Sequence, residues 1–157
     1  MKWFLIIVLI VVIMIIAKAV SDQYREKYDF YYNLKIFFEK FKINLSFKQE
    51  KLNDFLNEMK FKKNFNIFIQ SYKEFLHTNQ LNLSNIKILD EEEKNQLDFY
   101  LKNIGKHDTN GELLQLDSFL SEINQKVKKC EQDKNKLCPM ILKLSLLFAI
   151  GVGIILI

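Results

Sequence analysis

Histidine, cysteine and clustered carboxylates carry most protein chemistry, and this 157-residue chain has few of them at useful spacing. His77 and His107 lie far apart, and neither has a second His or Cys at metal-ligand spacing. Cys130 and Cys138 are eight residues apart, which matches no zinc pattern. On one helix their Cα atoms would be about 12 Å apart, too far for a disulfide. We expect both to be small apolar core residues, with redox chemistry or lipid attachment as the alternative.

The remaining candidates for chemistry have structural explanations. The acidic run Asp90 to Glu93 is the expected start of a helix, because Asp90 can accept a hydrogen bond from the Glu93 amide and the helix dipole favours carboxylates there. A phosphate-binding loop at Gly105-Lys106 would need Gly at position 100 and Ser or Thr at position 107, which hold Tyr100 and His107. Since no nucleophile, base and orienting residue form a group, the sequence predicts a protein that is not an enzyme and uses no metal or cofactor.

Composition divides the chain into two apolar ends and a charged middle. Residues 3–17 contain no polar side chain, residues 144–157 contain only Ser145, and all 19 acidic residues lie within residues 22–133. The middle, residues 21–138, carries 20 basic and 19 acidic residues with a single Arg. This balance excludes a nucleic-acid surface, which needs an excess of cations. Four Gly and one Pro are too few for the turns of a β-rich chain.

Both apolar ends are long enough to cross a membrane, since a spanning helix needs about 20 mostly apolar residues. We expect transmembrane helices at residues 1–20 and 139–157, flanking a helical domain at residues 21–138. Lys18 and Lys143 lie near the ends that join this domain, where each ammonium group can reach the membrane interface. Basic residues near the spans are far more numerous on the domain side, so the positive-inside rule places the domain in the cytosol.

A cleaved signal peptide is the competing interpretation of the N-terminus. Lys2 would form its basic region, residues 3–17 its apolar region, and Ala17-Lys18-Ala19 its cleavage site. A lysine in the middle of that site fits poorly, and the apolar run continues into a helical pattern without a break. We therefore favour an uncleaved anchor.

Apolar residues recur at helical spacing in five stretches of the middle region. This pattern predicts an all-α fold, an antiparallel bundle of about five to six helices. Residues 78–87 are rich in Asn and are the expected longest loop. Gly105 is expected to end a helix before a tight turn, and Thr109 with Glu112 has the spacing of a capping box. The stretches are Leu34–Leu45, Leu52–Met59, Phe65–Leu76, Leu97–Ile104 and Leu113–Cys130.

The last stretch has the alternating three- and four-residue spacing of a heptad seam. Its register continues into the apolar C-terminus, so one helix is expected from about Thr109 into the second span, with Pro139 removing one of its hydrogen bonds. A seam of this kind packs equally well within one bundle or between two chains. The seam residues are Leu113, Leu116, Leu120, Ile123, Val127 and Cys130, then Lys134, Leu137, Ile141, Leu144, Phe148 and Gly151.

Residues 97–108, followed by Glu112, Leu116 and a long charged helix that enters an apolar end, resemble the stage III sporulation protein AB family. That family has a Leu-Gly-x-x-Asp turn, a Gln four residues later, a hydrophobic residue after four more, and a Lys-rich helix leading to an apolar tail that contains glycine. The resemblance covers about two-thirds of the chain, including Tyr24-Arg25-Glu26-Lys27 after the first apolar segment, while residues 61–89 match only in helical character. Departures are Glu112 for Gln, Ile104 for Leu, and Ser145 for a frequent Gly.

The resemblance implies a cytosolic domain similar to the helical domains of the F-type platform protein of type II secretion, which couples a cytosolic ATPase to assembly in the membrane. The implied partners are the sporulation ATPase of the same apparatus and its other membrane components, with the anchor on the mother-cell side. Neither nucleic acid nor a small-molecule substrate is expected. Gly105, Asp108 and Glu112 are then expected to form a hinge and a docking edge. The alternative is a membrane-anchored scaffold that self-associates through its C-terminal heptad helix.

Overall fold

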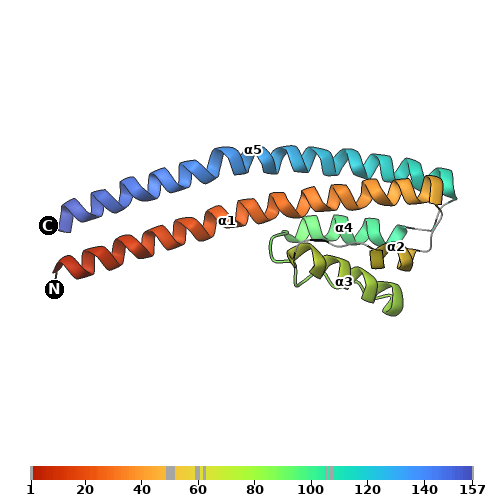
Figure 1. Ribbon diagram of the computed structural model, residues 1–157, viewed down its shortest axis with the longest axis horizontal. Helices are drawn as coiled ribbons and strands as arrows, with labels where there is room; N and C mark the ends of the chain where they lie inside the picture. Colours follow the sequence, from red (N-terminus) through yellow and green to blue (C-terminus); the bar gives the residue numbers. More distant parts are fainter. Residues whose placement is uncertain are drawn as a thin grey trace. The chain divides into compact units, whose positions relative to one another are not determined.

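The computed structural model describes residues 2–48, 52–58, 61, 63–104, 106 and 108–156. These residues form α-helices and one π-helical turn and contain no strand, which confirms the predicted all-α class (Figure 1). The elements are α1 (Lys2–Ile43), η1 (Asn44–Lys48), α2 (Leu52–Glu58), α3 (Lys63–Thr78), α4 (Glu91–Asn103) and α5 (Thr109–Leu156). The chain divides into two compact units: unit 1 comprises Met1–Tyr28 with Lys128–Ile157, and unit 2 comprises Asp29–Val127.

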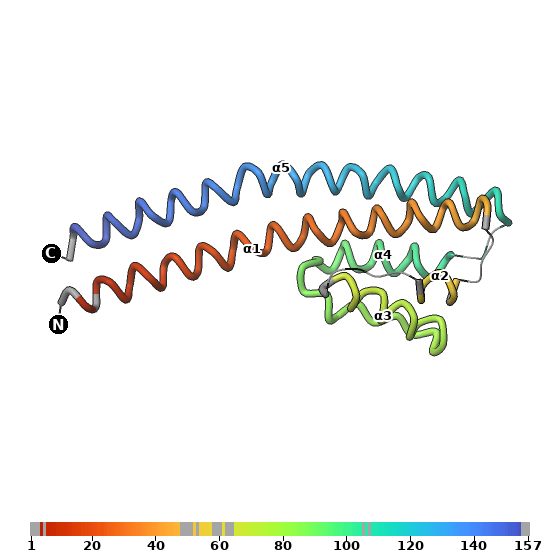
Figure 2. Tube along the Cα trace, in the orientation of Figure 1, coloured from red at the N-terminus to blue at the C-terminus, as the bar shows by residue number. Residues whose placement is uncertain are grey.

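Two helices, α1 and α5, account for more than half of the chain (Figure 2). α1 is 42 residues long and contains neither Gly nor Pro, so nothing in its sequence interrupts the backbone ladder. α5 is 48 residues long and continues past Pro139 to Leu156. Both findings confirm the prediction that a single helix connects each apolar end with the charged middle. The compact units divide these helices at residues 28 and 127, further from the chain ends than the hydropathy boundaries at residues 20 and 139.

The core of unit 2 is built on one face of α1, where phenylalanine recurs at helical spacing. Phe37 is 1% exposed and its ring packs against α2 through Phe55 and against α3 through Phe65 and Phe68. The ring centroids lie 5.8, 6.4 and 6.1 Å away, within the range of favourable tilted and edge-on aromatic pairs. Aromatic packing against α1 thus fixes the positions of α2 and α3.

The next residue of α1, Phe38, connects the other side of the core. Its side chain is fully buried, and its ring meets Tyr100 of α4 and Phe119 of α5 edge-on at 5.3 and 5.1 Å. Tyr100 and Phe119 stack on each other with centroids 3.7 Å apart. One side chain therefore joins three helices of unit 2.

The start of α4 has the predicted cap. Asp90 Oδ1 accepts a hydrogen bond from the Glu93 amide at 2.8 Å, and Glu93 Oε2 accepts one from the Asp90 amide at 3.1 Å. The loop before it, residues 79–90, begins at Asn79, whose φ of 56° is one that Asn tolerates better than most residues. Leu83, Ile86 and Leu89 turn back from this loop into the core and are at most 6% exposed.

The cap of α5 differs from the prediction. Asp108, not Thr109, is the N-cap, because its Oδ1 accepts from the Gly111 amide at 3.2 Å while its carbonyl accepts from the Glu112 amide at 2.9 Å. Asp and Thr are both good capping residues, and the helix begins one residue earlier than the Thr109 capping box requires.

Candidate functional site

Glu112, one of the three residues predicted at the docking edge, lies inside unit 2, where it is 3% exposed. Tyr72 of α3 and Tyr100 of α4 are buried near it. Burial, and after it the negative charge of Glu112, raises the pKa of both tyrosine hydroxyls above their ordinary value of 10.0. The three residues come from α3, α4 and α5, so this polar group lies where the three helices meet.

The other two predicted turn residues have different positions. Asp108 is exposed and caps α5, as described above. Gly105 lies outside the described residues, as does His107. Before the turn, α4 ends at Asn103, whose carbonyl accepts from the Lys106 amide at 3.3 Å. The structure therefore leaves Asp108 as the predicted turn residue whose side chain a partner can reach.

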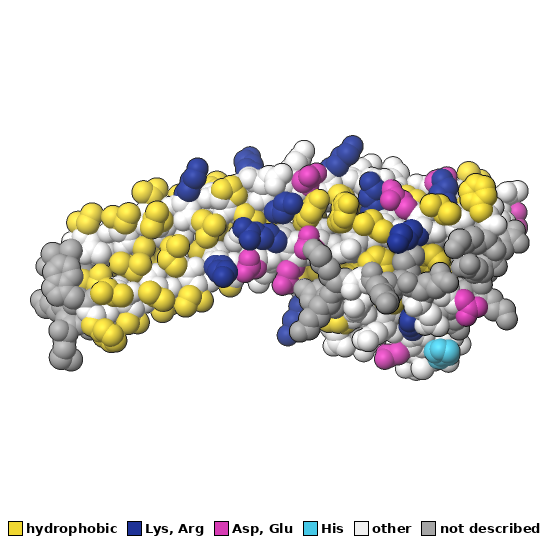
Figure 3. All heavy atoms as spheres, viewed as in Figure 1, with side chains coloured by type: hydrophobic (Ala, Val, Ile, Leu, Met, Phe, Trp, Pro, Cys, Tyr) yellow, Lys and Arg dark blue, Asp and Glu magenta, His cyan; other side chains and the backbone are white. Residues whose placement is uncertain are grey.

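Sequence reasoning missed three large apolar side chains that are exposed at the same end of unit 2, where α1 ends and α5 begins. Ile43 is 54% exposed, Phe47 is 83% exposed and Leu114 is 73% exposed. We call these residues, together with Asp108, the end surface. Figure 3 shows hydrophobic side chains at the surface of this end. Single exposed apolar residues are common, but several grouped together mark a contact site.

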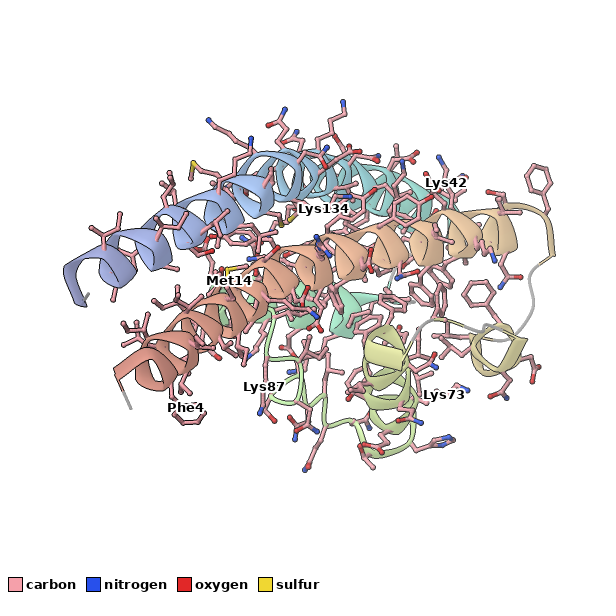
Figure 4. The ribbon with its side chains drawn as sticks, turned by 60° about the vertical axis from the view of Figure 1, so that its left-hand side comes forward. Phe4, Met14, Lys42, Lys73, Lys87 and Lys134 are labelled. Carbon is pink, nitrogen blue, oxygen red and sulfur yellow. The ribbon has the colours of Figure 1, made fainter. Side chains whose placement is uncertain are left out.

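An ion pair stabilises the helices that carry the end surface. Lys42 of α1, labelled in Figure 4, donates a hydrogen bond to Asp117 Oδ1 of α5. The pair joins the last turns of α1 to the first turns of α5, next to Ile43 and Leu114 in sequence. The exposed apolar side chains are thus presented from two helices that are fixed to each other.

A second polar contact ties α5 to the start of α4. Lys126 Nζ donates to Gln96 Oε1 at 3.0 Å and to Tyr31 Oη at 3.5 Å, and it lies 4.0 Å from Glu93 Oε1. The cavity beside these groups has a volume of about 20 Å³, which is room for one water molecule and far below that of a ligand pocket. These polar residues connect helices and do not enclose a substrate.

In unit 1 the apolar parts of α1 and α5 pack antiparallel in a constant register. Ser145 Oγ donates to Met14 Sδ at 3.7 Å, and Figure 4 shows Met14 between the two helices. Cys138 Sγ donates to the Ser21 carbonyl at 3.4 Å. Toward the chain ends, Gly153 is buried next to Ile6, and a Cβ at Gly153 would lie 4.0 Å from Ile6 Cγ2.

This register places the two predicted membrane-flanking lysines at nearly the same position along the axis of the helix pair. Met14 pairs with Ser145 and Ser21 pairs with Cys138, so Lys18 lies opposite position 141. Lys18 and Lys143 therefore differ by two residues, about 3 Å along the helix pair. Both lysines are exposed.

The outward faces of the pair are apolar on the chain-end side of these lysines. Phe4 is 70% exposed, Ile15 61%, Phe148 64% and Ile154 70%. α1 and α5 are both long and apolar enough to cross a membrane. A core helix of a soluble bundle would bury most of these side chains, whereas a membrane leaves them in contact with lipid.

The heptad prediction is correct for the first part of α5 and wrong near its end. Leu116, Leu120 and Ile123 are at most 8% exposed within unit 2, but Leu144 and Phe148 are 56% and 64% exposed. The buried face there contains Ala149 and Gly153 instead. An α-helix drifts by about 20° per heptad from a strict seven-residue repeat, so after four heptads the buried face has moved by about one residue.

The two cysteines are buried thiols, as predicted. Cys138 is 4% exposed against Ser21, and Cys130 is 9% exposed on the heptad seam. Among the residues that the structure describes, no three His, Cys, Asp or Glu side chains are grouped as metal ligands.

Comparison with known proteins gives one match. The family model described as stage III sporulation protein AB matches residues 2–157. No curated protein and no solved structure matches the chain. The family match includes residues 61–89, where the sequence alone showed only helical character.

Proposed function

Because the chain belongs to the stage III sporulation protein AB family and is thus a sporulation protein, we propose that it is a non-enzymatic, membrane-anchored assembly protein of a sporulation transport apparatus. In this proposal it couples a cytosolic ATPase to a membrane complex. The observation that carries the proposal is the division of the chain into two units. Unit 1 is a helix pair whose outward side chains are apolar, and unit 2 is a helical bundle with exposed apolar side chains at one end.

Membrane anchoring is supported by the two long apolar helices and by Lys18 and Lys143 at one height. α1 continues without a break through Ala17-Lys18-Ala19, and Ala17 is 6% exposed. A lysine in the middle of this Ala-x-Ala site fits a signal-peptide cleavage site poorly, which favours an anchor that stays attached. The excess of basic residues beside the spans supports a cytosolic position for unit 2, and the family supports the mother-cell side.

Docking of the ATPase at the end surface is supported by its exposed apolar side chains. The heptad seam is unsuited to this task, because Leu116, Leu120 and Ile123 pack inside unit 2. The same burial argues against the alternative of a scaffold that self-associates through the C-terminal heptad helix. Phe47 and Leu114, in contrast, are 83% and 73% exposed, and Leu114 follows Asp108 by six residues, after the turn that the family resemblance singles out.

A non-enzymatic role is supported by the positions of the polar residues. Asp90, Glu93 and Asp108 cap helices, Glu112 is enclosed by the bundle, and Lys126 bridges helices. The cavity described beside Glu93 and Lys126, of about 20 Å³, is too small for a substrate.

The test is binding of the cognate ATPase by the full chain in lipid nanodiscs. The proposal predicts saturable binding that sediments with the nanodiscs and is absent from empty ones. An active ATPase that does not bind would contradict it. Sedimentation equilibrium of the chain in density-matched detergent tests the scaffold alternative, since a stable dimer without ATPase binding would favour that alternative.

A further inference from the structure

The positive charge of this chain is concentrated in one unit. Unit 1 contains nine basic and four acidic residues, while unit 2 contains 14 basic and 15 acidic residues. Together these account for all 23 basic and 19 acidic residues of the chain. The whole excess of positive charge therefore lies on the two helices that carry the apolar segments.

The register of unit 1 places most of this charge just beyond the apolar segments. Measured along the pair from Lys18, Lys143 lies about 3 Å nearer the chain ends, Lys136 lies about 7 Å in the other direction, and Arg25 and Lys134 lie opposite each other at about 10 Å. We call these five residues the basic band. Asp22 lies within the same layer, 3.9 Å from Arg25, and Glu26 and Asp133 lie one residue beyond it, so basic residues outnumber the nearby carboxylates by five to three.

The cations of the basic band point outward and can be reached. Lys18, Lys136 and Lys143 are exposed, and the Arg25 side chain is 58% exposed. Lys134 Nζ lies 3.6 Å from the centroid of the Tyr28 ring, which fixes its position without neutralising its charge. Figure 3 shows basic side chains standing on the surface beside the yellow apolar region.

We propose that the basic band binds the headgroups of anionic phospholipids. This inference rests on the proposed membrane anchoring, and it specifies which class of lipid gathers around the anchor. The layer between hydrocarbon and water is about 5–8 Å deep on each side of a bilayer. The Cα atoms of the basic band spread over about 13 Å along the pair, and long Lys and Arg side chains can bend to place their charges in that layer. Clusters of four to eight basic residues beside a spanning helix attract anionic lipids.

We expect the phosphate group that binds the basic band to belong to a lipid, because exposed apolar side chains lie beside the cations on the side of the chain ends. Ile16 is 59% exposed, Leu144 56% and Leu147 65%, so a bound headgroup has acyl-chain contacts one turn away. A free phosphate ion would meet the same cations but none of this apolar surface.

The experiment measures lipid preference by electron paramagnetic resonance of spin-labelled phosphatidylglycerol and phosphatidylcholine around the full chain in phosphatidylcholine bilayers. The intact chain should restrict the motion of more phosphatidylglycerol than phosphatidylcholine. Replacing Lys18, Lys136 and Lys143 by Gln should lower this preference about fivefold or more, the effect of losing at least one cation near a membrane surface. Salt at about 0.5 M should weaken the preference of the intact chain.

A matched control variant removes the same charge from unit 2, with Lys87, Lys102 and Lys106 replaced by Gln. It should keep the preference of the intact chain, and an equal loss would overturn the proposal, because the effect would then follow from net charge alone. Competition by free glycerol phosphate would also overturn it in favour of a simple phosphate site. A chain that inserts and binds the ATPase but shows no lipid preference defeats only this inference, whereas a chain that fails to insert defeats the proposed anchoring.

Discussion

Replacing Phe47 by Ala should weaken binding of the ATPase at the end surface while leaving the stability of the fold almost unchanged. Phe47 is 83% exposed, so Phe47→Ala should change the free energy of unfolding by no more than about 0.5 kcal/mol. Full burial of a phenylalanine side chain contributes about 1.5–3 kcal/mol, and covering the exposed share of Phe47 with a partner is therefore worth about 2 kcal/mol. Phe47→Ala should thus weaken ATPase binding about 30-fold.

The assay is titration of the ATPase onto nanodiscs that carry the intact chain or a variant. Leu114→Ala, at 73% exposure, should weaken binding to a similar degree. Tyr32→Ala is the matched control, because Tyr32 is a 45% exposed aromatic residue of α1 about 20 Å before Phe47. The reasoning is refuted if Phe47→Ala and Leu114→Ala bind the ATPase as tightly as the intact chain, or if Tyr32→Ala weakens binding equally.

Three further predictions concern the bundle itself. Phe38→Ala should lower the free energy of unfolding by about 3–5 kcal/mol in denaturant titrations, because it empties a fully buried site between three helices, whereas a loss below about 1 kcal/mol would contradict the packing described. Asp108→Ala should cost about 1 kcal/mol and Asp108→Asn much less if capping is its structural role; equal losses from the two changes would exclude it. Burial and the charge of Glu112 raise the pKa of Tyr72 and Tyr100, so the folded state keeps protons that the unfolded chain releases above its ordinary value of 10.0. Stability should then fall as pH rises beyond about 10, by up to about 1.4 kcal/mol per pH unit for each tyrosine, and Phe at both positions should flatten this dependence in thermal melts at alkaline pH.

The sequence was a good guide where one local rule acted alone. The Asp90 cap was predictable because Asp90 and Glu93 have the three-residue spacing of a capping box at the start of a helical pattern. The length of α1 was predictable because no Gly or Pro interrupts it. In these cases local hydrogen bonding and backbone propensity decide the outcome.

The sequence was a poor guide where two similar residues compete. Asp108 and Thr109 are adjacent and both cap well, so the choice between them depends on how α5 packs and not on residue type. For Leu113 and Leu114, which are identical in chemistry, the heptad spacing correctly placed only Leu113 on the seam, but it did not show that Leu114, Ile43 and Phe47 are all exposed at the same end of unit 2. Exposure of this kind comes from tertiary packing, which spacing describes only approximately over a long helix.

Glu112 shows why the candidate site was harder to predict than the fold. A glutamate in the first turns of a helix is normally a surface residue, and the resemblance marked it as part of a docking edge. In the structure Glu112 is 3% exposed and close enough to Tyr72 and Tyr100 for its charge to raise the pKa of both hydroxyls. The end surface that a partner can reach combines Asp108 with exposed apolar residues that the helical pattern assigned to no surface.

The central claim is that unit 2 lies in the cytosol on a double membrane anchor, and cysteine labelling in intact cells tests it most directly. Asn85 is an exposed loop residue suited to a reporter cysteine, in a background with Cys130 and Cys138 replaced by Ala. The account predicts that a membrane-permeant maleimide labels Asn85→Cys and an impermeant maleimide does not until the cells are opened. Labelling by the impermeant reagent in intact cells would place unit 2 outside and would contradict both the orientation and the proposed coupling to a cytosolic ATPase.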